Sequence, residues 1–147
     1  MIALLQRVSR SKVAVDGKTI GKIDLGYNIL LGVVKKDDKK DIEKLVQKIV
    51  NLRVFTDENG KMNKSILDVK GKVLVVSQFT LAGSVKKGRR PSFDSAMPSV
   101  EAKKLYEEFC LQLSKHIEVQ TGEFGAMMEV EIVNDGPVTF IINSKEL

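Results

Sequence analysis

The sequence predicts an α+β fold: a curved, mixed β-sheet with a barrel-like core and two main helices packed outside it. The first observation is the order of patterns, in which groups of strand-like segments alternate with single helix-like segments. The second is a helical period of apolar residues in two segments, from about Asp38 to Leu52 and from about Ser99 to His116. The third is that Gly26–Val34 and Lys72–Val76 are almost continuously apolar, as buried strands are.

Length and composition indicate one domain spanning residues 1–147. A chain of 147 residues buries about two thirds of its unfolded surface without disulfides or metal, and 43% hydrophobic with 29% charged residues is typical of soluble globular proteins. No apolar run approaches the roughly 20 residues that cross a membrane. Met1–Leu5 is apolar, but Arg7 and Arg10 follow at once, unlike a secretory signal. We therefore expect a cytoplasmic protein without membrane contact.

The scarcity of cysteine and histidine limits the chemistry. Cys110 is the single cysteine and His116 the single histidine, so no internal disulfide, zinc cluster, or Cys-His or Ser-His catalytic pair of the usual kind is expected. We expect neither a metal nor another cofactor. Cys110 lies on the apolar stripe of the second predicted helix, which favours a core position. His116 lies at the end of that helix, where a surface position is expected.

The net charge of +5 and the isoelectric point near 9.3 favour an anionic partner such as nucleic acid or a nucleotide. A modest lysine excess is also common on soluble surfaces, so charge alone leaves both interpretations open. Ala82–Pro98 is a loop of small residues with four cations in five positions: Lys86, Lys87, Arg89 and Arg90. This basic loop is placed to contact phosphate, and a solvated loop is the alternative.

The first half of the chain begins with a predicted strand, Ile2–Val8. Lys12–Ile20 is predicted to be a hairpin, because Asp16-Gly17 supplies the positive φ that a two-residue turn needs. After the strand Gly26–Val34, Asp37 or Asp38 is placed to cap the first helix. The apolar face of this helix contains Ile42, Leu45, Val46, Ile49 and Val50.

The second half alternates less regularly. Arg53–Thr56 is predicted to be a short strand, and Met62–Val69 is ambiguous. Val119–Gly125 is predicted to be a loop, whose two glycines can bring backbone amides close to a flat ligand. Two apolar, β-branched runs follow as the last predicted strands, Ala126–Val133 and Val138–Ile142.

Four candidate site residues follow the predicted central strand Lys72–Val76 directly: Ser77, Gln78, Phe79 and Thr80. Polar residues after a buried strand lie where a rigid support commonly displays binding groups. The alternative is that the serine and threonine only close the last hydrogen bonds of the strand.

The pair Gly136-Pro137 lies in a tight connection between the last two predicted strands. The cis form of an X-Pro bond costs only about 0.5–1 kcal/mol, and glycine before proline relieves the usual steric clash. Such a pair can point its carbonyl groups in directions that ordinary backbone cannot. A plain turn is the alternative interpretation.

Together these segments resemble the D-aminoacyl-tRNA deacylases of the bacterial type, over essentially the whole chain. The matching blocks, in chain order, are Leu5–Arg10, Asn51–Phe55, Ser77–Leu81, Lys87–Phe93, Thr121–Ala126 and Asn134–Thr139. The chain departs from the family pattern at Ala82-Gly83, where tyrosine often stands, and at Met127, where an acidic residue is common. Both departures concern loop contacts and not the core motifs.

The resemblance implies a homodimer that hydrolyses the ester bond of D-aminoacyl-tRNA, with each active site built across the subunit boundary. Ser77–Thr80 of one chain would face a cis Gly136-Pro137 of the other, whose carbonyls leave no room for an L side chain. Glycine mischarged onto tRNA would also be accepted. The resemblance assigns the terminal adenosine to Phe124, Gly125, Ala126 and Met128, and gives Arg7 a role in holding the Gly-Pro segment.

The expected mechanism needs a positioned water and oxyanion stabilisation, and no strong side-chain base. Backbone groups around Ser77, Gln78 and Phe79 would orient the ester, and the ribose 2′-hydroxyl would help to activate water, as is proposed for the family. Thr80 would position the substrate, since no neighbouring residue could deprotonate it. The alternative function is a non-catalytic tRNA- or RNA-binding module that uses the basic loop and the aromatic residues for docking.

Overall fold

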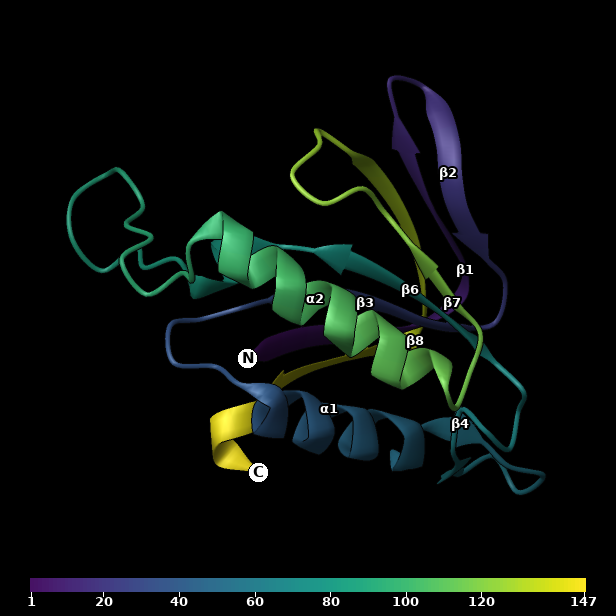
Figure 1. The fold of residues 1–147 in the computed structure, drawn as a ribbon. Helices are drawn as coiled ribbons and strands as arrows, with labels where there is room; N and C mark the ends of the chain where they lie inside the picture. Colours follow the sequence, from purple (N-terminus) through teal and green to yellow (C-terminus); the bar gives the residue numbers. More distant parts are fainter.

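The computed structural model describes residues 1–147 and confirms the predicted α+β fold (Figure 1). The main sheet contains β1 (Ile2–Val15), β2 (Lys18–Ile23), β3 (Gly26–Gly32), β6 (Lys72–Ser77), β7 (Val119–Thr121) and β8 (Glu129–Asn143). A separate hairpin contains β4 (Phe55–Thr56) and β5 (Met62–Lys64). The helices are α1 (Lys39–Asn51) and α2 (Ser99–Ser114), with short 3-10 turns η1 (Phe79–Ala82) and η2 (Ser144–Glu146). None of these helices combines the length and the apolar character that a membrane-spanning helix needs.

The long strand β1 organises the sheet. It pairs antiparallel with β3 along its first half, with β2 along its second half, and with β8 along its other edge. On the far side of β3, the strands β6 and β7 run parallel to it. A Cβ added at Gly21 of β2 would lie 2.7 Å from the carbonyl oxygen of Thr121 in β7. The sheet therefore curls until its edges nearly meet, which makes it barrel-like.

Two apolar cores follow from this curvature. The larger one lies between the sheet and the two helices, and it includes the predicted face of α1, with Ile42, Leu45, Val46, Ile49 and Val50 all buried. The smaller one fills the curled end of the sheet with Val8, Val13, Ile23, Leu74 and Val76. The main core holds β6 and α2 in fixed positions, and the candidate site depends on both elements.

Local signals predicted two features correctly. Asp16 and Gly17 have φ angles of 50° and 76°, so the predicted hairpin turn between β1 and β2 is confirmed. Asp38 caps α1, since its side chain accepts a hydrogen bond from the Lys40 amide, while the Asp41 carboxylate accepts one from the Asp38 amide. Both features depend on residues that are neighbours in sequence.

Two predicted boundaries were wrong. The segment around Gly136 is not a turn between two strands, because β8 continues through it along β1. Val8 pairs with Asn134 and Gln6 with Thr139, so the four residues 135–138 bulge opposite Arg7 alone. Val119–Thr121 was predicted to be part of a loop, but it forms β7 because β6 offers a parallel partner.

Candidate active site

The candidate site begins at the carboxyl ends of β6 and β7. Because these strands are parallel neighbours, the segments that follow them emerge at the same edge of the sheet. Residues 77–80 continue from β6, and residues 122–126 continue from β7. The carbonyl oxygen of Val75 joins the two strands, because it accepts a hydrogen bond from the Gly122 amide at 3.2 Å.

The segment after β6 turns sharply into η1. The Gln78 amide donates to the carbonyl oxygen of Leu31 in β3 at 2.8 Å, which fixes the start of the turn. Ser77 and Gln78 are half-buried, whereas Phe79 and Thr80 are exposed. The side-chain amide of Gln78 donates a short hydrogen bond to the Thr80 hydroxyl oxygen. The group beside Thr80 is therefore a hydrogen-bond donor, which cannot remove its proton.

The segment after β7 packs on α2. The rings of Phe124 and Tyr106 lie 5.6 Å apart, and the Tyr106 hydroxyl donates to the Val75 carbonyl oxygen at 2.9 Å. A cavity of about 580 Å³ opens between α2 and this segment, lined by Lys103, Tyr106, Glu107, Cys110, Thr121, Gly122, Glu123, Phe124, Gly125 and Ala126. Three of the predicted adenosine-binding residues, 124–126, thus border one cavity.

Met128 lies just outside this lining. A Cβ added at Gly122 would lie 2.6 Å from the Met128 sulfur, so the thioether packs directly on the Gly122 backbone. Met128 also packs against the smaller apolar core. The close approach to Gly122 therefore fixes the path of the chain between β7 and β8.

The Gly136–Pro137 peptide bond is cis, and both residues are exposed. Beneath them, the buried guanidinium of Arg7 holds the bulge. Its Nε donates to the Asp135 carbonyl oxygen at 3.1 Å and lies 3.3 Å from an Asp135 carboxylate oxygen. Its Nη1 donates to the Val54 carbonyl oxygen at 2.6 Å. Arg7 thus fixes the residue before the Gly-Pro pair to the chain that follows α1.

Asn134 closes the bulge from its other side. Its side-chain oxygen accepts a hydrogen bond from the Val138 amide at 3.2 Å, and its side-chain nitrogen donates to the Thr139 hydroxyl at 2.9 Å. Sequence reasoning did not assign a role to Asn134, Val54 or Tyr106. An asparagine four residues before an amide that it can cap is a local signal that was available, whereas the contacts of Val54 and Tyr106 depend on tertiary packing.

One chain does not bring the two main motifs together. Ser77 stands in the same row of the sheet as Leu31 and Ala3, while the bulge stands opposite Arg7. Four residues along β1 separate these rows by about 13 Å, and three strand spacings from β6 to β8 add about 14 Å in the perpendicular direction. Measured along the sheet, the two motifs of one chain are therefore separated by about 20 Å.

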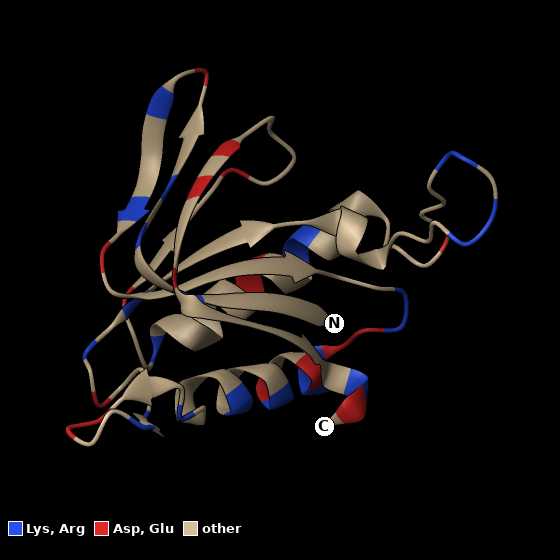
Figure 2. Cartoon of the chain, turned by 180° about the vertical axis from the view of Figure 1, so that it is seen from behind, with Lys and Arg blue, Asp and Glu red and all other residues tan.

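The basic loop projects away from the body of the molecule (Figure 2). Two hydrogen bonds between the backbones of Ser84 and Ser92, at 2.7 and 2.9 Å, close its base. All four cations are exposed and none forms an ion pair: Lys86, Lys87, Arg89 and Arg90. Their charge is therefore free to act on a ligand.

Two titratable side chains that line the cavity beside α2, Tyr106 and Cys110, have raised pKa values. Burial raises the pKa of the Cys110 thiol to about 12, as expected for a core residue. Burial also raises the pKa of Tyr106 well above its ordinary value. His116 is exposed beyond the end of α2. No group of three His, Cys, Asp or Glu side chains could hold a metal ion.

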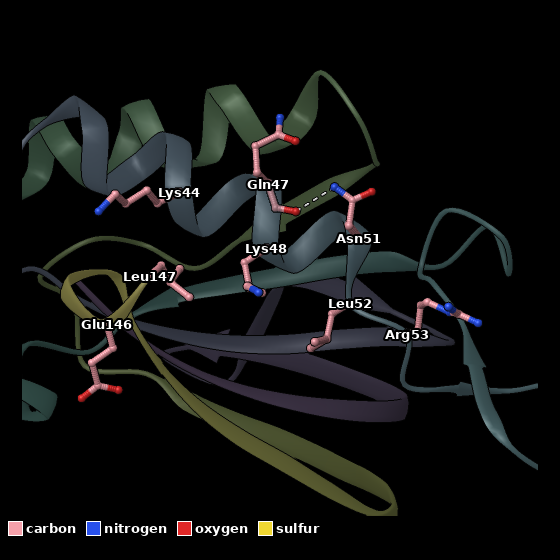
Figure 3. Close-up of a pocket in the computed structure, with 8 residues that line it drawn as sticks. All are labelled: Lys44, Gln47, Lys48, Asn51, Leu52, Arg53, Glu146 and Leu147. Carbon is pink, nitrogen blue, oxygen red and sulfur yellow. Dashed lines mark hydrogen bonds between the residues drawn. The ribbon is translucent and has the colours of Figure 1, made fainter.

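A larger cavity, about 660 Å³, lies elsewhere, beside α1 and the C-terminal residues (Figure 3). It is lined by Lys44, Gln47, Lys48, Asn51, Leu52, Arg53, Glu146 and Leu147. It contains no predicted site residue and no nucleophile, and its cations are accompanied by a carboxylate. The smaller cavity between α2 and the segment after β7 is therefore the better candidate, because three predicted site residues line it: Phe124, Gly125 and Ala126.

The fold defines a small α+β protein with a barrel-like sheet, and its candidate site lies at the ends of two parallel strands. The sequence matches the family described as D-Tyr-tRNA(Tyr) deacylase over residues 4–143. D-aminoacyl-tRNA deacylases from a Nitratiruptor species and from Persephonella marina are 66% and 64% identical, over 100% of both chains. The chain belongs to the D-Tyr-tRNA(Tyr) deacylase family.

Solved structures of similar proteins include two with contrasting descriptions. One, described as a c-Myc DNA unwinding element binding protein, is 46% identical with a TM-score of 0.92, covering 97% of this chain and 98% of that one. The other, described as a probable eukaryotic D-amino acid tRNA deacylase, has a TM-score of 0.79 over the same shares at 18% identity. The second likeness shows the shared fold.

Proposed function

We propose that this chain hydrolyses the ester bond of D-aminoacyl-tRNA and releases free amino acid and tRNA. The observation that carries the proposal is the family match over residues 4–143, which includes both Ser77–Thr80 and Gly136-Pro137. The protein is an enzyme that acts on aminoacyl-tRNA. Because aminoacyl-tRNA is made and used in the cytoplasm, we place its activity there.

The chemistry rests on main-chain groups. The aminoacyl ester is already reactive, so orienting it and stabilising its oxyanion are sufficient to accelerate attack by water. In our proposal the backbone around Ser77, Gln78 and Phe79 makes these contacts, and the substrate 2′-hydroxyl helps to activate the water. Thr80 positions the substrate, since the Gln78 amide beside it donates a hydrogen bond and cannot act as a base.

Handedness is selected by steric exclusion. The exposed Gly136-Pro137 segment, held from below by Arg7, would face the α-carbon of the bound aminoacyl group. An L side chain would collide with this main chain, whereas a D side chain would point outward and glycine would fit. Glycine mischarged onto tRNA is therefore a second proposed substrate.

This selection requires a second subunit. Because about 20 Å of sheet separates the two motifs of one chain, Ser77–Thr80 of one protomer would meet Gly136-Pro137 of its partner in a homodimer. The sheet face opposite the helices offers a surface for this contact, and in Figure 2 no helix covers it. Ile141 on this face is 73% exposed, with Leu4 and Leu30 half-buried nearby.

The remaining predicted residues would bind the RNA. Phe124, Gly125, Ala126 and Met128 would hold the terminal adenosine at the cavity below α2. The basic loop, Lys86–Arg90, would contact phosphates, because its cations are exposed and unpaired.

A binding module without catalysis is the second candidate, supported by the basic loop and by the similar protein described as a DNA unwinding element binding protein. Mixing the protein with D-tyrosyl-tRNA and with L-tyrosyl-tRNA separates the two. We expect release of D-tyrosine alone. Equal survival of both esters would support the binding module and contradict the enzyme.

A further inference from the structure

An exposed aromatic pair lies between the candidate active site and the basic loop. Phe79 and Phe93 are 57% and 38% exposed, and their rings meet edge to face with centroids 5.0 Å apart. Phe79 belongs to η1, and Phe93 lies after the four cations of the basic loop, where its ring contacts that of Phe79. The sequence assigned a backbone role to Phe79 and no role to Phe93. Two solvent-exposed phenyl rings at a site edge require an explanation.

The pair is held in place by the surrounding backbone. A Cβ added at Gly83 would lie 2.9 Å from Cε1 of Phe93, so the absence of a side chain there makes room for the ring. The backbone hydrogen bonds between Ser84 and Ser92 stand directly before Phe93. The Ser95 hydroxyl donates to the carbonyl oxygen of Ala82, which fixes the chain just after Phe93.

The charge around the pair points to RNA. The unpaired cations of Lys86–Arg90 extend from the closed base of the loop, and the carboxylate of Asp94, next to Phe93, accepts a hydrogen bond from Ser92 at 2.7 Å. A stacking surface next to a cationic arm is the arrangement by which proteins bind single-stranded nucleic acid. A duplex does not fit this surface, because its bases present only their edges.

We propose that Phe93, supported by Phe79, stacks an unpaired base of the tRNA 3′ end, upstream of the terminal adenosine, while the basic loop contacts the phosphates of that strand. The placement of the adenosine rests on the proposed function. We call the pair of Phe79 and Phe93 the platform. It would bind the part of the substrate that remains the same whichever amino acid is attached.

The kinetic test compares two substrates that differ only in the upstream nucleotides. For Phe93→Leu we expect the KM for D-tyrosyl-tRNA to rise about tenfold, within the range for losing one base–aromatic stack, with kcat retained. The KM for D-tyrosyl-adenosine should stay unchanged. The matched control is Val85→Ala, at an exposed apolar residue of the same loop, which should change neither value. An equal rise in KM for both substrates, or no rise in KM for either, would overturn the proposal.

A binding test is independent of catalysis. The chain contains no tryptophan, so Phe93→Trp introduces a single tryptophan, whose emission reports on this aromatic pair. An RNA trinucleotide of sequence CCA, with no amino acid attached, should quench the tryptophan emission. Adenosine alone or inorganic phosphate alone should not. Absence of quenching by CCA would contradict stacking. If quenching occurs in a protein that hydrolyses no ester, the proposed function fails while the platform stands.

Discussion

Thr80 shows how the immediate surroundings of one residue limit its chemistry. Its hydroxyl is exposed next to the backbone groups proposed to stabilise the oxyanion, where a nucleophile could stand. However, its neighbour Gln78 donates a hydrogen bond to it, and a side-chain amide cannot act as a base. The geometry therefore favours a positioning role and leaves direct attack to water.

Replacing Thr80 tests this assignment. We expect Thr80→Ala to lower kcat/KM for D-tyrosyl-tRNA about tenfold, equivalent to about 1.4 kcal/mol of transition-state stabilisation, because only orientation is lost. Thr80→Ser, which keeps the hydroxyl, should retain most of the activity. Complete loss in Thr80→Ala, together with an acyl-enzyme in the wild type detected by mass spectrometry, would show that Thr80 is the nucleophile.

At the scale of elements, the Val75 carbonyl oxygen joins three parts of the site. It accepts hydrogen bonds from the Tyr106 hydroxyl of α2 and from the Gly122 amide after β7. Val75 itself lies two residues before β6 ends at Ser77. Tyr106 also packs on Phe124. A helix thereby fixes the relative positions of both strand ends.

A matched pair of tyrosine variants tests this link. Tyr106→Phe should lower the free energy of unfolding by about 1 kcal/mol, since a buried hydrogen bond is lost, and should raise the KM for D-tyrosyl-tRNA. Tyr27 is also fully buried, but its hydroxyl has no partner. Tyr27→Phe should therefore leave stability equal or higher in urea titrations. Similar destabilisation by both variants would mean that the hydroxyl of Tyr106 has no specific role.

Asp41 links the start of α1 to η2. Burial opposes its ionisation, but hydrogen bonds from Lys145 and Ser144, both at 2.7 Å, and from the Asp38 amide hold the pKa of Asp41 below its ordinary value of 3.8. Because the pKa of Asp41 is lower in the folded state, its ionised carboxylate stabilises the fold at pH values above the pKa that it has in the unfolded chain. This contribution is lost as the pH falls below about 4 and approaches the folded pKa.

Asp41→Asn should remove this dependence. We expect the variant to be about 2–3 kcal/mol less stable at pH 7, because charge-assisted hydrogen bonds are lost. Its unfolding free energy should fall less steeply than that of the wild type between pH 4 and pH 2. Parallel pH profiles for the two proteins, measured by denaturant titration, would contradict the assignment.

At the scale of the whole molecule, the open face of the sheet explains how two distant motifs could form one site. Leu5 pairs with Phe140 and faces the helices, so the neighbouring pair of Leu4 and Ile141 faces the other way. A partner subunit on this face would cover exposed apolar area and bring its Gly136-Pro137 to Ser77–Thr80.

A charge on this face should separate the subunits. Ile141→Lys should weaken dimerisation at least a hundredfold, about 2.7 kcal/mol, because it places an unpaired charge in the interface. Hydrolysis of D-tyrosyl-tRNA should fall with it. Val100→Lys, at a residue of α2 that is 66% exposed, is the control and should change neither property. An active monomer in sedimentation measurements would contradict the cross-subunit site.

The parts of the fold that depend on neighbouring residues could be predicted from the sequence. The Asp16-Gly17 turn and the Asp38 cap are of this kind. The bulge at residues 135–138 could not be predicted, because it arises from the register of β8 against a strand about 130 positions earlier. β7 was missed because its three residues become a strand only through pairing with β6.

The candidate site divides in the same way. Ser77–Thr80 was recognisable at the end of an apolar run, and Arg7 came from the resemblance. The role of Tyr106 was hidden, since a tyrosine on an apolar helical stripe also fits an ordinary core position. Its hydroxyl partner, Val75, is set by how α2 crosses the sheet, which no local pattern specifies.

The central claim is that the partner's main chain selects handedness, and mixed dimers test it most directly. The double variant Phe79→Pro, Pro137→Gly lacks an oxyanion N–H, and it also lacks the fixed φ that keeps the Gly-Pro segment rigid. Proline is accepted at Phe79, the first residue of η1, because Gln78 before it has φ and ψ angles of −141° and 81°, outside the helical region that proline disfavours in the preceding residue.

Wild-type homodimers should reject L-tyrosyl-tRNA, and homodimers of the double variant should be inactive. When the two chains are co-expressed, the account predicts that mixed dimers hydrolyse L-tyrosyl-tRNA, because an intact Ser77–Thr80 then faces a relaxed partner segment. If purified mixed dimers remain unable to hydrolyse the L ester, handedness is not selected across the subunit boundary.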